Sequence, residues 1–170
     1  MQPSLGRNSS GFTMIELVAV IVLLGILAAV ALPRFFNVST EARIAALESI
    51  ASAMRTTISL TQVNAKLAGL DAVPSNPGAG QSAYIIETEL GRSEIDFRNL
   101  CPESSAELAD ALDMADYMML NLTNDMSIAT DNQFTRIGFE ITSNTVSGCY
   151  VRYDSFGDPQ CTVEVVSADC

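Results

Sequence analysis

The chain has 170 residues, with 9 basic and 20 acidic side chains, a formal net charge of −11 and no histidine. Without histidine, Ser-His and Cys-His nucleophile pairs and a histidine general base are excluded, and the acid excess argues against electrostatic capture of nucleic acid. The stretch "NPGAGQS" lacks the lysine of a phosphate-binding loop. The sequence therefore predicts a protein that is not an enzyme, needs no cofactor and does not bind nucleic acid directly.

Residues 12–32 form an almost wholly apolar run, in which Glu16 is the only charged residue. A helix of this length, at about 1.5 Å per residue, spans roughly 30 Å, which matches the hydrocarbon core of a bilayer. A secretory signal peptide has a shorter apolar stretch followed by a small-residue cleavage site, and no clear site of that kind precedes Pro33. The sequence thus predicts a transmembrane helix behind a polar leader, whose only charge is Arg7.

The carboxylate of Glu16 raises two interpretations. A charge at mid-membrane depth costs about 2.5–3.5 kcal/mol, so one interpretation is that Glu16 lies near enough to the start of the run to reach the interface. In the other, cleavage between Gly11 and Phe12 places a new α-amine four residues away, and the two opposite charges offset each other's desolvation. If that amine belongs to a neighbouring chain, Glu16 sets the register between packed helices.

The stretch "G-FTMIELV", followed by the apolar run, resembles the class III signal of type IV pilins. The resemblance implies that a prepilin peptidase cuts after Gly11 and methylates the new N-terminal Phe12, and that Glu16 serves in assembly. Pro33 falls where many pilins also carry proline. The continuation "ALPRFFNVSTEAR" and the cysteines near the end further resemble mannose-sensitive haemagglutinin pilins.

This resemblance implies a structural subunit of a type IV pilus, used for surface attachment, biofilm formation or motility. The implied partners are other copies in a helical homopolymer, the prepilin peptidase and the inner-membrane pilus assembly machinery. The precursor would lie in a bacterial inner membrane and the mature chain in an extracellular pilus. Two alternatives stay open: a pseudopilin of a type II secretion system, and a minor or tip pilin that acts as an adhesin or DNA-uptake factor. Four cysteines argue against the first, because the major pseudopilin is usually disulfide-free and binds calcium.

A second helical pattern follows Pro33, with an apolar stripe at spacings of three and four residues: Ile44, Leu47, Ala51, Met54 and Ile58. Joined to the apolar run, it predicts one helix from about Phe12 to about Ala68, with Gly69 as its stop. Gly25 and Pro33 are the predicted positions of a break, because proline removes an intrahelical hydrogen bond and clashes with the preceding turn.

The remaining residues predict a head with an α+β fold. "DAVPSNPGAGQSAY" reads as a loop, and Ser104 with Glu107 suggests a capping box for a short helix. Period-two patterns follow around Ile137 and in "TVSGCYVRY" and "QCTVEVV", which predict an antiparallel sheet of three or four strands packed on the amphipathic half of the long helix. The expected divisions are a leader (1–11), a transmembrane and assembly helix (12–33), its amphipathic continuation (34–68) and the head (69–170).

The head carries four cysteines, and an exported domain with an even number of cysteines is typically held by disulfides: Cys101, Cys149, Cys161 and Cys170. Three connectivities are open. A Cys149–Cys161 bridge would close the last hairpin, whereas a Cys149–Cys170 bridge would fix the C-terminus. The cysteine-bounded region of the resembling pilins favours the second, which leaves Cys101 for Cys161.

Metal sites have little support in the sequence. No C-x₂-C motif and no histidine occur, which argues against zinc. Calcium candidates are Asp154 and Asp158 in one turn, and a second group in another stretch: Asn124, Asp125, Asp131 and Asn132. Neither stretch has the spacing of an EF-hand, so solvated loops are favoured over a calcium site.

Overall fold

The computed structural model describes residues 12–170 except 109, 120–124, 144–145 and 158–159, and gives only the backbone of 32–37 and 79–81. Its elements are α1 (Met14–Leu67), a 3₁₀ helix η1 (Gly78–Ala83), β1 (Ile85–Thr88), β2 (Gly91–Glu94), α2 (Met114–Met118), β3 (Ser127–Thr130), β4 (Phe134–Glu140), β5 (Cys149–Asp154) and β6 (Thr162–Val166). The chain divides into two compact units, one up to Ser39 and one from Thr40, and α1 contributes to both.

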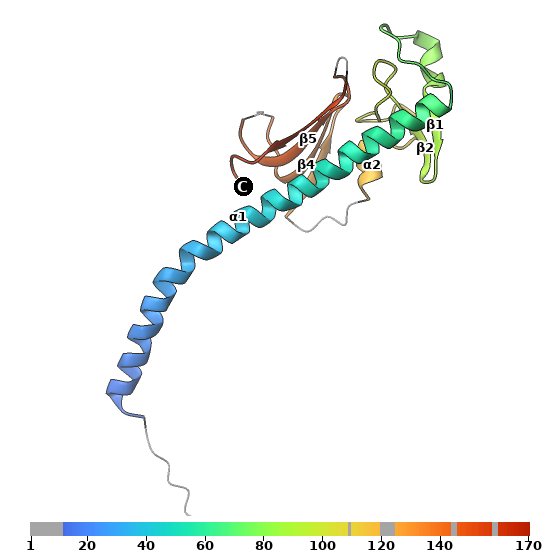
Figure 1. Cartoon of the computed structure of the whole chain (residues 1–170). Coiled ribbons are helices and arrows are strands. Elements are labelled where there is room, and N and C mark those ends of the chain that lie inside the picture. The colour runs from blue at the N-terminus through green and yellow to red at the C-terminus, as the bar shows by residue number, and fades with distance from the viewer. Residues whose placement is uncertain (1–11, 109, 120–124, 144–145, 158–159) are drawn as a thin grey trace, which may run out of the picture. The chain divides into compact units, whose positions relative to one another are not determined.

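The first unit consists of the N-terminal part of α1, drawn in blue in Figure 1. Its stretch Met14–Ala31 has a mean hydropathy of 2.8 and is long and apolar enough to cross a membrane. The predicted break is wrong for the single chain, because α1 is helical through both Gly25 and Pro33. Proline removes only one backbone donor, and glycine permits a break without imposing one, so the flanking turns keep the helix continuous.

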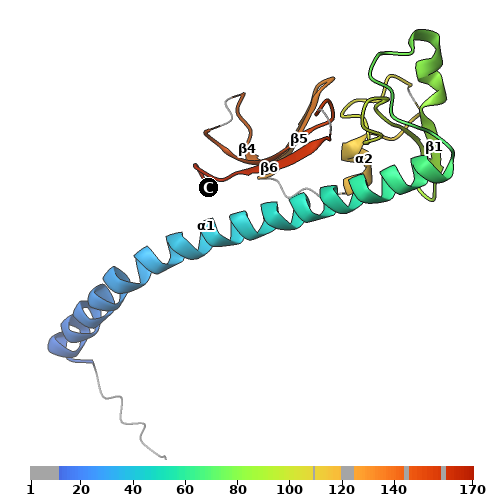
Figure 2. The same ribbon diagram turned by 45° about the horizontal axis from the view of Figure 1, so that its top comes forward.

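The second unit contains an antiparallel four-stranded sheet with the order β3-β4-β5-β6, so every strand pairs with its neighbour in the sequence. Ile137 of β4 lies opposite Val151 of β5, which in turn lies opposite Val165 of β6. Figures 1 and 2 both show this sheet beside the cyan-green part of α1. The predicted α+β fold with an antiparallel sheet is therefore confirmed.

The predicted apolar stripe of α1 forms the core against this sheet. Leu47, Ala51 and Met54 are fully buried and Ile58 is partly buried. They pack with side chains from the strands that include Ile137, Val151 and Tyr153. Burial of large apolar side chains contributes about 1.5–3 kcal/mol each, so this contact is the main stabilising interface of the head.

A second core cluster lies at the C-terminal end of α1, where Gly69 ends the helix as predicted. Gly69 has a positive φ of 79°, its N–H donates to the Lys66 carbonyl, and the Leu70 N–H donates to the Ala65 carbonyl. This is the Schellman arrangement, in which glycine accepts the left-handed conformation without a Cβ clash. The cluster also holds Ile86 of a two-stranded sheet, β1-β2, that the sequence did not predict.

The short helix α2 has its N-cap nine residues after the predicted one, at position 113 in place of 104 (113 − 104 = 9). Its N-cap is Asp113, whose side chain accepts from the Asp116 N–H while the Asp116 carboxylate accepts from the Asp113 N–H. The box at Ser104 and Glu107 is wrong because both groups serve other partners. The Ser104 hydroxyl donates to the Gln133 carbonyl, and the Glu107 N–H donates to the Glu94 carboxylate.

Candidate functional site

The apolar part of α1 is the first candidate site, because its side chains have no packing partner within the described residues. Every residue from Phe12 to Val30 is exposed, and the exposed set includes ten or more large apolar side chains, such as Ile15, Leu23 and Leu27. Soluble monomers rarely expose a contiguous apolar surface of this kind, which marks a site for a membrane or another protein.

Glu16 lies at the N-terminus of this helix and bonds to Thr13. The Glu16 carboxylate accepts from the Thr13 N–H at 2.9 Å and from the Thr13 hydroxyl at 2.7 Å, and the Glu16 N–H donates to that hydroxyl at 3.4 Å. This is the reciprocal pattern of a capping box, and the sequence "TMIE" carries its signature, although the sequence analysis missed it. Thr13 therefore holds the carboxylate near the helix start in the single chain.

The other predicted residues of this region lie in different surroundings. Phe12 precedes α1 and is highly exposed, whereas Gly11 lies outside the described residues. A side chain built at Gly25 would meet nothing within 4 Å, so this glycine leaves room on the helix surface. The cleavage, methylation and assembly roles of these residues stay predictions.

The four cysteines form two disulfides in the head, Cys101–Cys161 and Cys149–Cys170, and none is free. This is the connectivity that the pilin resemblance favours. Cys149–Cys170 joins the start of β5 to the last residue of the chain, and the Cys170 carbonyl also accepts from the Thr40 hydroxyl on α1. Cys101–Cys161 joins the loop after β2 to the residue before β6.

Two of the calcium candidates, Asp154 and Asp131, have protein partners in the structure. The Asp154 carboxylate accepts from the Gln133 amide at 3.1 and 3.2 Å and from the Phe156 N–H at 2.9 Å. Asp131 accepts from the Arg136 guanidinium and from two backbone N–H groups of its turn. Asp158 and Asn124 lie outside the described residues, within which no group of three or more Cys, Asp or Glu is placed to bind a metal.

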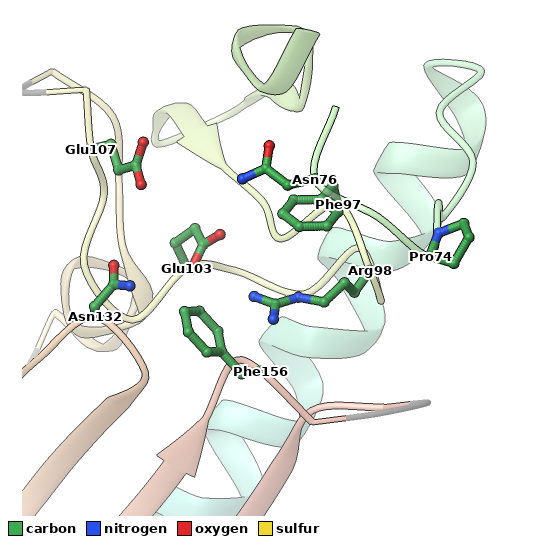
Figure 3. Close-up of a pocket in the computed structure, with 8 residues that line it drawn as sticks. All are labelled: Pro74, Asn76, Phe97, Arg98, Glu103, Glu107, Asn132 and Phe156. Atoms are coloured by element: carbon green, nitrogen blue, oxygen red, sulfur yellow. The ribbon is translucent and has the colours of Figure 1, made fainter. Parts of the chain in front are cut away.

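A cavity of about 430 Å³ in the head gathers residues from four loops: Pro74, Asn76, Phe97, Arg98, Glu103, Glu107, Asn132 and Phe156. Figure 3 shows Arg98 between the rings of Phe97 and Phe156, with Glu103 across from its guanidinium. The Arg98 carbon lies 5.0 Å from the Phe97 ring centre and 4.1 Å from that of Phe156. No sequence pattern indicated this cavity, because its residues are scattered over more than 80 positions and meet only in the fold.

The carboxyl group of Glu103 is the most perturbed acid of this cavity. Burial, followed by the nearby charges of Asp96 and Glu94, raises the pKa of Glu103 to about 8, although Arg98 opposes the shift. Asp96 is fully buried and binds Arg98 through both of its carboxylate oxygens, with the shortest distance at 2.6 Å. The Asp96–Arg98 pair therefore leaves Glu103 as a buried acid without an ion-pair partner among the described residues.

Comparison with known proteins bears on the N-terminal part of the chain. Residues 6–32 match the family model described as the prokaryotic N-terminal methylation motif. The chain is 40% identical over 77 residues to the type IV narrow pilus major component PilA5 of Thermus thermophilus, which covers 45% of this chain. The match spans 66% of that relative, slightly less than two thirds of its length. No solved structure matches the chain at a significant level.

The methylation motif covers the end of the polar leader and the apolar part of α1, with Glu16 near its start. The long helix, the antiparallel sheet and the two disulfides agree with the fold that this family implies. The narrower resemblance to mannose-sensitive haemagglutinin pilins stays a prediction. The methylation motif and the pilin match together support a type IV pilin family for this chain.

Proposed function

We propose that this chain is the structural subunit of a type IV pilus filament, used for surface attachment, biofilm formation or motility. One observation carries the proposal: a helix with every residue from Phe12 to Val30 exposed has a single carboxylate at its start. Such a surface is stable only when lipid or other apolar helices cover it. A filament core built from copies of the same helix supplies that cover after the chain leaves the membrane.

Processing of the leader would prepare the chain for this step. A prepilin peptidase would cut between Gly11 and Phe12 and methylate the new N-terminus, which leaves an amine four residues from Glu16. The amine of one chain and the Glu16 carboxylate of the next then attract each other. This attraction is strongest when both groups are desolvated in a medium of low dielectric constant. A pair of this kind favours one axial offset between helices over the others.

The proposed divisions of the chain follow from these roles. Residues 12–33 anchor the precursor in the inner membrane and pack in the filament core, and residues 34–68 continue the helix along the head. Residues 69–170 complete the head that faces the exterior of the pilus. The inner-membrane assembly machinery would extract the processed chain and add it to the filament.

The relative's printed name, a major component of a narrow pilus, supports a filament-forming subunit over a minor or tip pilin. Two disulfides in the head argue against a pseudopilin of the kind that carries none. The acidic composition of the chain, with 20 acids against 9 bases, argues against a DNA-uptake factor that holds DNA through basic side chains.

Mass spectrometry of filaments sheared from cells tests the proposal directly. The mature subunit should begin with N-methylated Phe12 and contain 170 − 11 = 159 residues. The same spectra should show it as the most abundant protein of the sample, and electron micrographs should show that the sample consists of filaments. A mature chain that still begins at Met1, or that is cut after Ala31, would contradict the processing step, and a trace amount in the filaments would favour a minor pilin.

A further inference from the structure

We propose that the head cavity around Glu103 binds a small organic cation through its primary ammonium group, such as a lysine side chain or a short alkyl amine. The site lies in the head and does not depend on the assembly role proposed for the N-terminal helix. It is defined by the cavity residues that line it, with Glu103 as the counter-ion.

The first support is the position of the Glu103 side chain. Its residue is 6% exposed, yet no described residue donates a hydrogen bond to its carboxylate, and Figure 3 shows that carboxylate turned into the cavity toward Asn76 and Arg98. The carboxylate of so buried a residue keeps only part of its hydration and accepts no hydrogen bond from a described residue in its place, which is costly. A ligand that donates hydrogen bonds would supply the donors that the Glu103 carboxylate lacks among the described residues.

The second support is that the nearby cation, Arg98, is already committed elsewhere. Asp96 accepts from the Arg98 Nε at 3.1 Å and from a terminal nitrogen at 2.6 Å, and the two phenyl rings enclose the guanidinium. Glu103 is thus beside a neutralised pair, while Glu107 adds a second carboxylate to the lining. The lining therefore carries an excess of negative charge that a cation would balance.

The third support is the size and chemistry of the space. A volume of about 430 Å³ holds a small organic molecule and is far larger than one ion requires. The side-chain amides of Asn76 and Asn132 lie on different sides of Glu103, so polar groups surround the place where an ammonium would sit (Figure 3). An ammonium group has three donors, which suits two carboxylates and an amide oxygen.

A divalent metal fits this lining less well. Among the residues that the structure describes, no three acidic or sulfur side chains converge as metal ligands. The guanidinium of Arg98 also borders the space, and a doubly charged ion would be repelled more strongly than a single ammonium.

Binding of a cation should expel a proton from Glu103. Because the pKa of Glu103 is about 8, this group is about nine-tenths protonated at pH 7, and the bound ammonium favours the ionised form. The charged groups that act on Glu103 are Asp96, Glu94, Arg98 and Glu107, and Glu103 in turn acts on the buried Tyr153. We expect release of about 0.9 proton per ligand at pH 7 and about 0.1 at pH 9.

The test uses the full chain in detergent micelles and n-butylammonium as the probe, with n-butanol as its uncharged counterpart. Nuclear magnetic resonance would follow the side-chain amides of Asn76 and Asn132, and calorimetry in two buffers of different ionisation enthalpy would count the protons. Butylammonium should shift both amides in a saturable manner with the proton release given above, whereas butanol should not. Glu103→Gln should weaken binding at least ten-fold and abolish the proton release.

Glu48→Gln is the matched control, because Glu48 is an exposed acid on α1 outside the cavity, and it should bind as the wild type does. Thermal unfolding of each variant establishes that it is folded. Equal binding by Glu103→Gln, equal shifts from butanol, or saturation by Ca²⁺ at a lower concentration than butylammonium would each overturn the proposal.

Discussion

Glu103 is a carboxylate in a buried residue, whereas Glu16 is an exposed carboxylate in an apolar run, and the two acids have different partners. Thr13 supplies Glu16 with hydrogen bonds from its backbone and hydroxyl, so the acid is satisfied at the helix start. Glu103 receives no hydrogen bond from a described residue and sits among other acids, so it takes up a proton more readily than an ordinary glutamate. The proposed partner of the first acid is a neighbouring chain, and that of the second is a ligand in the cavity.

Removal of the buried charge should change how the stability of the head depends on pH. Since the pKa of Glu103 is raised from 4.5 to about 8, its stabilising contribution is fully present below pH 4.5 and is lost as the pH rises through 8. At pH 8, the free energy of unfolding of Glu103→Gln should therefore exceed that of the wild type by a few kcal/mol, at about 1.4 kcal/mol per pKa unit. The variant should accordingly unfold at a higher denaturant concentration. Unfolding curves of both proteins between pH 5 and 8 measure this difference.

Glu48→Gln is again the control and should follow the wild-type curve. If wild type and Glu103→Gln lose stability in parallel between pH 5 and 8, the destabilising ionisation belongs to another group of the head.

Glu16→Ala should leave membrane insertion and folding of the head intact, because it removes a charge from the apolar run. It should sharply reduce incorporation into filaments, since the incoming chain loses its partner for the buried amine. Glu16→Gln should be nearly as poor, because an amide keeps the shape and not the charge. The measurement is the abundance in the membrane fraction against the yield of sheared filaments.

Thr13→Val separates assembly from helix capping. It removes the hydroxyl that makes two of the three bonds between Thr13 and Glu16 but leaves the carboxylate in place. We expect a filament yield close to that of the wild type. A loss as large as that of Glu16→Ala would mean that the capping box matters, and normal yield from Glu16→Ala would mean that apolar packing alone sets the register.

At the scale of elements, hydrogen bonds and disulfides fasten the loops of the head to one another and to its four-stranded sheet. Asn99 is 6% exposed, and its side-chain amide donates to the Ser155 and Gly157 carbonyls while its oxygen accepts from the Cys101 N–H. The Cys101–Cys161 bridge holds the same loops covalently. The Cys149–Cys170 bridge instead fixes the C-terminus to β5, so each disulfide secures a different part of the head.

Loss of the C-terminal bridge should lower the amount of folded subunit. Removal of a native disulfide from a small exported domain typically costs about 2–5 kcal/mol, so Cys149→Ser should reduce the abundance of the chain in the membrane fraction. Cys170→Ser should have the same effect, and the double variant should be no worse than either single one, because all three lose the same bond. Immunoblots of membrane fractions compare the four proteins.

Alkylation without prior reduction supplies the control for this experiment. The wild type should show no reactive thiol, and each single variant should show one. Modification of all four wild-type cysteines without a reductant would contradict the bridges.

At the scale of the whole molecule, the proposed filament role predicts that charge governs the contacts between finished filaments. The mature side chains would carry 8 basic and 20 acidic groups, since removal of residues 1–11 takes away only Arg7. Most of the acids follow Asn64 in the sequence, so they lie in the head that the filament would expose. Like charges on neighbouring filaments repel, which keeps filaments apart and soluble.

Filaments should therefore gather into bundles as the pH approaches the sequence isoelectric point of about 4.2. Electron microscopy and light scattering between pH 8 and 4 would follow this change. High salt at pH 7 should give a weaker form of the same effect, because screening shortens the range of the repulsion. Bundles that form equally at pH 8 and pH 4 would show that apolar patches, and not charge, control the contact.

Local patterns predicted much of this fold. The spacing of Leu47, Ala51 and Met54 predicted the buried face of α1, and the period-two pattern around Ile137 predicted a strand. Gly69 predicted the end of the helix. The prediction of a break at Gly25 and Pro33 failed in the single chain, because a weak helix position breaks only when something outside the helix makes another conformation more stable.

The sequence by itself determined the long helix, the apolar run and the acid at its start, because each depends on residues close together in the chain. The number of cysteines is likewise read directly from the sequence. Tertiary structure decided the hairpin β1-β2, the start of α2 at Asp113 and the cavity around Glu103. Ser104 could have capped a helix, but bonds to Gln133 and Thr135 took its hydroxyl. These contacts, between residues 29 and 31 positions apart, compete with local preference, and no local pattern records which one has the lower free energy.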